Sequence, residues 1–322
     1  MKTQQAYSGG RDTALRCPRS TYYPRTAQRA GPTVWLNLVC LDAPLVAIAW
    51  LWLFARSFQV PLQIGNGVAL FLTAWLIYLA DRFADALSLK PNSPRSLRQE
   101  FCLRHREVWI ATVILVGGFD AYVIWRTIAW QTFVFGAIVG TLALIYLVLN
   151  HPLGLIWRTL PAKELAIGML FAAGTVVALL PRLPMTTAFA VATVSFAALC
   201  ALNCISIAAW ERELDRAQGK VSIATRRLHA IRSAAKFCGV LSVAAFVLAV
   251  VFPLTAPIFA CIGVSALLLT SLNALPRVTE ARFLNPPRRL PNGRSFMSAD
   301  QRTALADLVL LTPIIALIVM SL

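Results

Sequence analysis

The chain has 322 residues, of which 58% are hydrophobic and 14% are charged, and its formal net charge is +16. An ordinary soluble domain is about 45–50% apolar and about 25% charged, so this composition excludes a soluble enzyme and indicates a polytopic membrane protein. In a soluble protein the positive charge would favour nucleic acid as a partner. In a membrane protein it reports on topology instead, and we expect the lipid bilayer and no nucleic acid as a partner.

The beginning of the chain differs from the rest in composition. The sequence predicts a basic, disordered cytoplasmic tail over 1–32 and a membrane domain over 33–322. Because the tail has no apolar core, we expect no cleaved secretory signal. Its single acidic residue is Asp12, which also suits a mitochondrial presequence. A bacterial inner membrane is preferred, and an organellar membrane stays open.

Apolar runs that are long enough, or nearly long enough, to cross a bilayer recur through the remaining sequence. They predict an all-α, multi-pass membrane bundle of about nine transmembrane helices, at 33–56, 62–87, 107–127, 129–149, 161–180, 186–210, 230–252, 255–273 and 302–322. Pro161 suits the first turn of the fifth helix. Ser298 and Gln301 have the spacing of a capping box before the last helix.

Basic residues are distributed unevenly over the connections between these helices. All but three of the 30 Lys and Arg residues lie in the tail or in the connections after the second, fourth, sixth and eighth helices; the exceptions are Arg56, Arg126 and Arg182. By the positive-inside rule, the N-terminus is predicted to be cytoplasmic and the C-terminus to lie on the opposite side.

Two acidic pairs stand at the cytoplasmic ends of the second and sixth predicted helices: Asp81 with Asp85, and Glu211 with Asp215. Residues at i and i+4 share a helix face with Cβ atoms about 5–6 Å apart, where two carboxylates repel by about 3 kcal/mol at an effective dielectric near 20. Mg²⁺ commonly bridges one or two carboxylates to substrate phosphates. The four side chains are therefore predicted to be catalytic ligands of Mg²⁺ and a diphosphate. Ion pairs with interleaved arginines, such as Arg212 with Asp215, are the structural alternative.

These two stretches resemble the aspartate-rich motifs of the UbiA prenyltransferase superfamily, whose members are nine-helix membrane enzymes. The family's first motif is N-D-x-x-D-x-x-x-D, and Asp81 and Asp85 match its last two aspartates, while Ile77 and Tyr78 replace the leading Asn-Asp. The second motif resembles D-x-E-x-D followed by Gly and Thr or Ser, and its positions correspond here to Glu211, Glu213, Asp215, Gly219 and Ser222.

The resemblance implies Mg²⁺-dependent transfer of a prenyl or polyprenyl group from its diphosphate to an acceptor, a quinone-precursor-like aromatic or another small molecule. Arg158 and Lys163, before and at the start of the fifth helix, are candidate diphosphate contacts or else positive-inside anchors. Arg95 is a candidate of the same kind. Asn203 resembles a polar position common in the family, and Tyr78 borders an acidic pair where an acceptor pocket would lie.

Two other functions stay open. The replacement of Asn-Asp by Ile77 and Tyr78 favours a catalytically inactive UbiA-like protein that binds a lipid diphosphate. A cation-coupled transporter is the third alternative, disfavoured because transporter sites tend to lie near the bilayer midplane, whereas these acids lie at helix ends. Asp42 and Asp120 fall inside predicted spans, where a carboxylate is a functional hypothesis by default.

Overall fold

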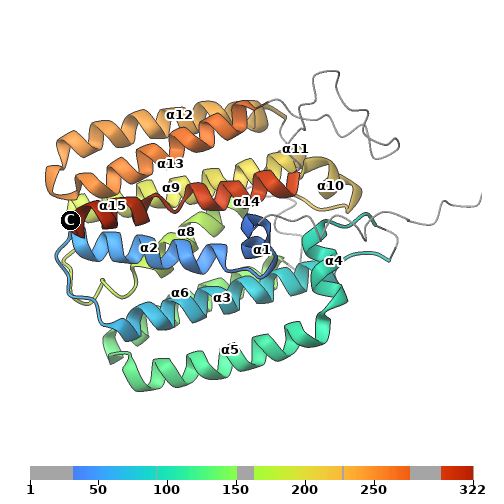
Figure 1. Cartoon of the computed structure of the whole chain (residues 1–322), viewed down its shortest axis with the longest axis horizontal. Helices are drawn as coiled ribbons and strands as arrows, with labels where there is room; N and C mark the ends of the chain where they lie inside the picture. Colours follow the sequence, from blue (N-terminus) through green and yellow to red (C-terminus); the bar gives the residue numbers. More distant parts are fainter. Residues whose placement is uncertain (1–31, 92, 151–162, 227, 276–298, 322) are drawn as a thin grey trace, which may run out of the picture.

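The computed structural model describes residues 32–91, 93–150, 163–226, 228–275 and 299–321. Within these ranges the secondary structure is entirely helical and contains no strand. Long helices run antiparallel along one axis (Figure 1). The predicted all-α bundle is confirmed; the predicted tail over 1–32 lies outside the described residues, apart from Pro32, which begins the first helix.

The long elements follow the chain order expected from the apolar runs. They are α2 (Asp42–Ser57), α3 (Ile64–Leu87), α5 (Arg106–Thr127), α6 (Trp130–Asn150), α8 (Lys163–Val176), α9 (Thr187–Trp210), α12 (Leu228–Val251), α13 (Ala256–Ala274), α14 (Ala299–Val309) and α15 (Thr312–Ser321). Shorter elements connect them: α1 (Pro32–Leu38), α4 (Leu97–Arg104), α10 (Arg212–Ala217), α11 (Ile223–Arg226) and the 3-10 turn η2 (Pro253–Thr255). Figure 1 places α4, α10 and α11 at one end of the bundle, called the charged end below, and the C-terminus at the other.

Seven segments of the described residues are long and apolar enough to cross a membrane: Ile64–Leu87, Arg106–Thr127, Trp130–Asn150, Thr187–Trp210, Ser233–Val251, Pro253–Ala274 and Asp300–Ser321. The chain is therefore a multi-pass membrane protein. The helices α2, with 16 residues, and α8, with 14, are shorter than these segments and shorter than the typical span of about 17–25 residues. Of the nine predicted spans, those over 33–56 and 161–180 therefore have no counterpart among these seven segments.

The prediction of one continuous helix over 33–56 is wrong. The chain leaves α1 after Leu38 and passes through Cys40, whose φ of 59° is in the left-handed region, before α2 begins at Asp42. The Asp42 carboxylate accepts a hydrogen bond from the backbone N–H of Ala43 at 3.0 Å. The break places polar side chains of α1 beside the start of α2, where a continuous helix would have separated them.

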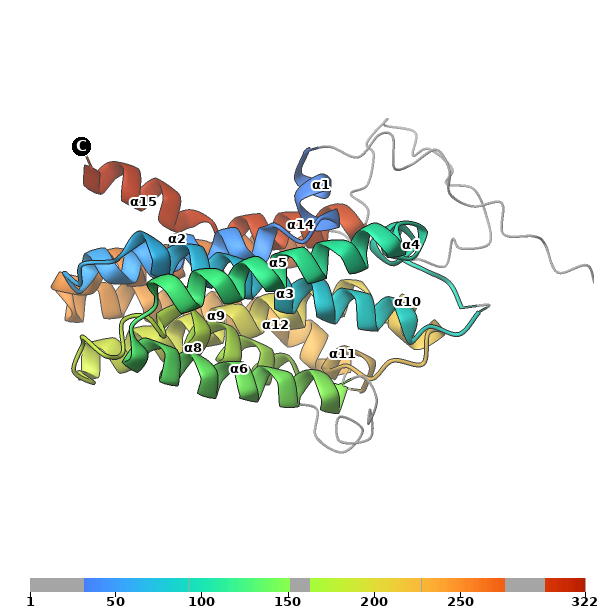
Figure 2. The ribbon, with the colours of Figure 1, turned by 90° about the horizontal axis from the view of Figure 1, so that it is seen from below.

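The last predicted span is also interrupted, between α14 and α15. Pro313 has no N–H to donate, and its ring opposes the carbonyl four residues earlier, that of Val309. The freed carbonyls find partners on other helices: Ser265 donates to the Val309 oxygen at 2.9 Å, and the Trp50 indole donates to the Leu310 oxygen at 2.8 Å. The break is thus stabilised by α13 and α2. Beyond it, α15 leans away from the bundle axis (Figure 2).

The largest packed core lies between α2, α9 and α13. Trp50 of α2 stacks on Phe196 of α9 with ring centroids 4.3 Å apart, and both side chains are fully buried. The neighbouring contact of α8 with α9 depends on a small residue, because a Cβ added at Gly168 would lie 2.6 Å from the Ala201 nitrogen and 2.7 Å from the Ala197 oxygen. Such close backbone approach is typical of membrane helix pairs with Gly at the interface. It fixes one wall of the cavity described next.

Candidate functional site

A cavity of about 640 Å³ lies between α2, α3, α6, α8 and α9, within the usual range of about 300–1,000 Å³ for small-molecule sites. Its wall at the charged end carries both acidic motifs and several cations. Its middle is lined by apolar and small side chains, among them Ala69, Leu70, Ala74, Ile77, Gly136, Gly140, Ala143, Leu170, Phe171 and Gly174. A charged opening above an apolar body suits an amphiphile with a polar headgroup.

The two acidic motifs are joined by an ion pair between Asp85 and Lys220. The Lys220 ammonium nitrogen lies 2.6 Å from each carboxylate oxygen of Asp85. Lys220 reaches this position because α10 ends in a Schellman motif. Gly219 has a φ of 71°. The Lys220 N–H donates to the Asp215 carbonyl at 2.8 Å, and the Gly219 N–H donates to the Arg216 carbonyl at 3.1 Å. The glycine of the second motif therefore turns the chain back towards the first.

Gln99 of α4 strengthens the same connection. It belongs to a capping box, in which Ser96 accepts from the Gln99 backbone N–H at 3.3 Å and the Gln99 side chain accepts from the Ser96 N–H at 2.9 Å. The remaining amide nitrogen of Gln99 donates to Asp85 at 3.1 Å, and Gln218 donates to the Gln99 oxygen at 2.8 Å. Helix capping thus fixes a side chain that contacts both motifs.

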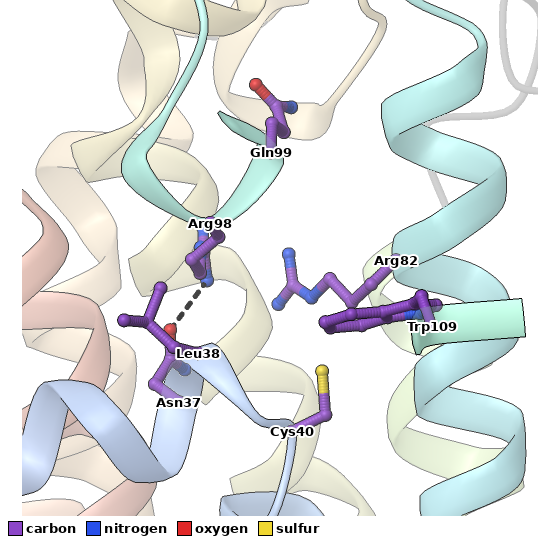
Figure 3. Close-up of a pocket in the computed structure, with 7 residues that line it drawn as sticks. All are labelled: Asn37, Leu38, Cys40, Arg82, Arg98, Gln99 and Trp109. Atoms are coloured by element: carbon purple, nitrogen blue, oxygen red, sulfur yellow. Dashed lines mark hydrogen bonds between the residues drawn. The ribbon is translucent and has the colours of Figure 1, made fainter. Parts of the chain in front are cut away.

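Arg98 forms the second long-range ion pair. Its guanidinium contacts the Glu211 carboxylate, and the two side chains are 7% and 16% exposed. The other terminal nitrogen of Arg98 donates to Asn37 of α1 at 3.5 Å (Figure 3), and Thr303 of α14 donates to Glu211 at 3.3 Å. Both ion pairs at this end join different elements, so they are not the within-helix pairs considered as the structural alternative.

Figure 3 shows Arg82 and Arg98 beside a small cavity of about 10 Å³, with the thiol of Cys40 and the ring of Trp109 on its wall. This volume is close to that of one water probe, about 10–15 Å³. Arg82 donates to the Tyr78 hydroxyl at 2.7 Å, which leaves its positive charge next to the site. The guanidinium groups of Arg82 and Arg98 therefore both lie near the acidic motifs.

Asp81 and Asp215 complete the predicted ligand set, and both line the large cavity. Burial raises the pKa of Asp215 to about 6, and the nearby Glu211 carboxylate acts in the same direction, while Lys220 and Lys163 oppose them. The structure thus brings Asp81, Asp85, Glu211 and Asp215 to one end of one cavity.

The structure places some of the remaining predicted site residues at the cavity and not others. Tyr78, Lys163 and Asn203 line the cavity. Arg95 is exposed and does not line it, because it precedes the capped start of α4 and only Arg98 and Gln99 of that segment turn inward. Arg158 lies outside the described residues.

Several lining residues were not predicted. Lys220 and Arg98 had been counted only as topological charges, although the glycine before Lys220 and the Ser-x-x-Gln capping box around Arg98 were visible in the sequence. Glu164 is 3% exposed and accepts from the Ile223 N–H of α11 at 3.0 Å, while its second carboxylate oxygen has no partner. No local signal marked Glu164.

A buried polar network lies about two helical turns deeper than Glu211, because Asn203 precedes Glu211 by eight residues on α9. Asn203 donates to Asp307 of α14 at 2.9 Å, and the Asn37 amide donates to Asp42 at 2.6 Å and to Asp307 at 3.2 Å. Asn203 and Asp307 line the cavity, and the side-chain oxygen of Asn203 has no partner. A buried acceptor without a partner costs about 1–3 kcal/mol, so this position favours a ligand that donates a hydrogen bond.

The carboxylates that the structure describes at the charged end do not form a complete Mg²⁺ site by themselves. In the described part of the chain, no three His, Cys, Asp or Glu side chains come together as a metal centre, and both oxygens of Asp85 contact Lys220. Mg²⁺, however, is usually held by one or two carboxylates together with substrate phosphates. A magnesium ion at this rim would therefore need diphosphate oxygens beside the carboxylates, and the protein alone would not hold it.

Comparisons of the chain with protein-family models, with curated proteins and with solved structures found no significant match. The residues of the cavity are therefore the basis for assigning a function.

Proposed function

We propose that this protein is a UbiA-like membrane prenyltransferase that binds a prenyl diphosphate in the large cavity and transfers the prenyl group to a small acceptor. One observation carries the proposal: a single cavity joins the two acidic motifs and their cations to a long apolar body. A polyisoprenoid diphosphate has the matching polarity, with a strongly anionic headgroup and an apolar chain that gains free energy when it leaves water.

The headgroup is proposed to lie at the charged end, against Lys163, Lys220 and Arg98. Carboxylates outnumber cations among the lining residues of this end, so a diphosphate needs additional positive charge there. Asp81, Asp85, Glu211 and Asp215 would hold Mg²⁺ together with the diphosphate oxygens. When bound, the ion supplies positive charge that stabilises the departing diphosphate.

The protein's own groups have separate roles in the proposed transfer. The bond between the first prenyl carbon and the diphosphate oxygen breaks, and its electron pair stays on the diphosphate, where Lys163 and Arg98 stabilise the charge. The apolar body keeps water away from the developing allylic cation. A nucleophilic atom of the acceptor then bonds to that carbon and loses a proton.

Asp307 is the proposed acceptor of this proton. It lies four residues from Thr303, which contacts Glu211, and four residues along α14 correspond to about 6 Å. Asp307 would therefore lie deeper in the cavity than the proposed headgroup, on the side where the reacting carbon would follow. Asn203 and Asn37 hold its carboxylate in place.

Binding and turnover need separate tests. The purified protein in lipid nanodiscs is mixed with labelled prenyl diphosphates of several chain lengths and with Mg²⁺, and binding is measured by equilibrium filtration. We expect binding that fails without Mg²⁺ and fails in a variant with Asp81→Ala and Asp215→Ala, while Arg95→Ala binds normally. The absence of Mg²⁺-dependent binding in the unmodified protein would refute the proposal.

The same samples are then given a panel of aromatic, polyol and lipid-alcohol acceptors, and pyrophosphate release is measured. Release with at least one acceptor is expected. Tight binding without release across the panel would instead support the second candidate function, a lipid-diphosphate-binding protein without turnover. The observation that favours this candidate is that Ile77, at the position of the family's leading Asn, lines the cavity with an apolar side chain.

The charged end is proposed to face the cytoplasm of a bacterial inner membrane. Arg95 is exposed at this end, so Arg95→Cys is a suitable reporter once the native cysteines have been replaced. A membrane-impermeant maleimide is expected to label it in inverted vesicles and not in intact cells. The opposite pattern would reverse the orientation.

A further inference from the structure

The cavity has a second polar region at the end remote from the charged end. Asp120 of α5 lines the cavity there and is only 4% exposed. One of its carboxylate oxygens accepts a hydrogen bond from the Thr73 hydroxyl of α3 at 2.7 Å, while the other is buried and has no partner in the described part of the chain. An acceptor left in this state costs about 1–3 kcal/mol, and an acidic residue inside a membrane segment is a functional candidate.

Two more polar side chains line the same region. Asn66, in the first turn of α3, is 5% exposed, and Thr132, in the first turn of α6, is 9% exposed. The structure shows no side-chain hydrogen bond for either of them among the described residues. Asn66 lies seven residues before Thr73 on α3, which is about 10 Å of helix. The polar lining therefore extends from Asp120 towards the far end of the cavity, where an apolar chain end would leave these groups without partners.

The chemistry of this region selects its ligand. The arginines at this end, Arg56, Arg126 and Arg182, are exposed and do not line the cavity, so an anionic group would meet the Asp120 carboxylate without a compensating cation. One carboxylate without phosphate oxygens from a ligand supplies too few ligands for Mg²⁺ or Ca²⁺. A hydroxyl group fits, because it can donate a hydrogen bond to the free oxygen of Asp120.

We infer that this region is a second binding subsite, which holds the hydroxyl at the far terminus of a long-chain ligand whose phosphate lies at the charged end. The twelve residues between Thr73 and Asp85 on α3 correspond to about 18 Å, and the apolar body of the cavity spans that interval. The placement of the phosphate rests on the proposed function. The hydroxyl subsite itself rests on Asp120 and its neighbours.

Matched pairs of ligands test the inference. Alkyl phosphates and the corresponding ω-hydroxyalkyl phosphates, in a series of increasing chain length, are titrated by calorimetry against the full-length protein in nanodiscs. We expect the added hydroxyl to tighten binding about tenfold at the chain lengths that bridge the two ends, and to weaken it at shorter lengths, where the hydroxyl would be buried among apolar side chains.

Variants locate the effect. Asp120→Leu is expected to abolish the gain from the hydroxyl without changing the affinity for the plain alkyl phosphate, and Asp120→Asn, which keeps an acceptor and the same shape, is expected to retain part of it. Thr112→Val is the matched control, because the Thr112 hydroxyl of the same helix donates to its own Val108 carbonyl and does not line the cavity.

The outcomes separate the hydroxyl subsite from the proposed headgroup site. No gain from the hydroxyl at any chain length, or a gain that persists in Asp120→Leu, would overturn it while leaving phosphate binding intact. If alkyl phosphates do not bind at all, the placement of the headgroup is refuted. In that case dodecanol and dodecane are compared by their thermal stabilisation of the unmodified protein and of Asp120→Leu. Stabilisation by dodecanol that requires Asp120 supports the hydroxyl subsite, and any other result overturns it.

Discussion

The ammonium group of Lys220 contacts both carboxylate oxygens of Asp85 at 2.6 Å, across 135 residues of sequence. This ion pair holds the loop after α10 against the end of α3 at the charged end of the cavity. The two side chains are 24% and 22% exposed, so the pair is largely shielded from water and less screened than a surface pair.

Removing one member of this pair is expected to destabilise the protein. Lys220→Met leaves the Asp85 carboxylate short of its main partner, and we expect a loss of about 1–2 kcal/mol. Unfolding of the purified protein, measured by temperature or denaturant in mild detergent, checks this. The double variant with Asp85→Asn should recover part of the loss, and strictly additive effects of the two substitutions would contradict a direct interaction. Lys236→Met, an exposed position on α12, is the control.

Gly219 is expected to be necessary for the position of Lys220. Its φ of 71° is in the left-handed region, which costs a residue with a Cβ about 1–2 kcal/mol. Gly219→Ala should therefore lower stability and also weaken binding of the prenyl diphosphate, since Lys220 moves away from the rim. Binding and unfolding are measured on the same preparation; an alanine variant with unchanged values for both would show that the Schellman turn does not position the lysine.

Arg98 and Arg95 form a matched pair for testing the site. They are separated by two residues, but Arg98 is 7% exposed and contacts Glu211, whereas Arg95 is exposed. Arg98→Met leaves the largely buried Glu211 carboxylate, which is 16% exposed, without its ion-pair partner, and we expect this to cost about 3 kcal/mol and to reduce diphosphate affinity. Arg95→Met should change stability by less than about 0.5 kcal/mol and leave affinity unchanged. Equal effects of the two variants would contradict the proposed headgroup site.

Replacing Gly168 or Gly136 by a larger residue is expected to have different effects on stability. Gly168 packs against the α9 backbone, so Gly168→Ala should destabilise the protein by about 1–3 kcal/mol. Gly136 of α6 lines the cavity and has no atom within 4 Å of an added Cβ, so Gly136→Ala should fold normally. Gly136→Phe should fold but shorten the longest prenyl chain that binds, which a chain-length series measures. Unchanged length selection would show that the chain does not pass α6.

Asp307 is expected to affect transfer more than binding. Asp307→Asn removes the proposed proton acceptor but keeps a side chain of the same shape beside Asn203. We expect prenyl diphosphate affinity within about twofold of the original, and a loss of turnover of about 10²–10⁴-fold, the usual contribution of a general base. Affinity is measured by filtration and turnover by pyrophosphate release. Asp307→Asn with full turnover would exclude Asp307 from this role.

Much of the architecture follows directly from the apolar runs, because a bilayer requires helices whose backbone groups are satisfied within each segment. The positions of α3, α5, α6, α9 and α13 agree with the predicted spans within a few residues. The breaks after α1 and after α14 were not predicted, since both lie inside apolar runs and are stabilised by distant groups, such as Trp50 for the Leu310 carbonyl.

The sequence also predicted the four acids that line the charged end of the cavity, because paired carboxylates at helix ends repel each other and are therefore informative. Only the tertiary structure decided their partners. Lys220 and Arg98 are part of the candidate site and Arg95 is not, because a Schellman turn orients Lys220 and a capping box orients Arg98. The spacing of these residues in the sequence does not show which of them turn inward. Asp120 was visible as a carboxylate within a span, but its free oxygen, its cavity and its distance from the charged end exist only once α3, α5 and α6 are packed together.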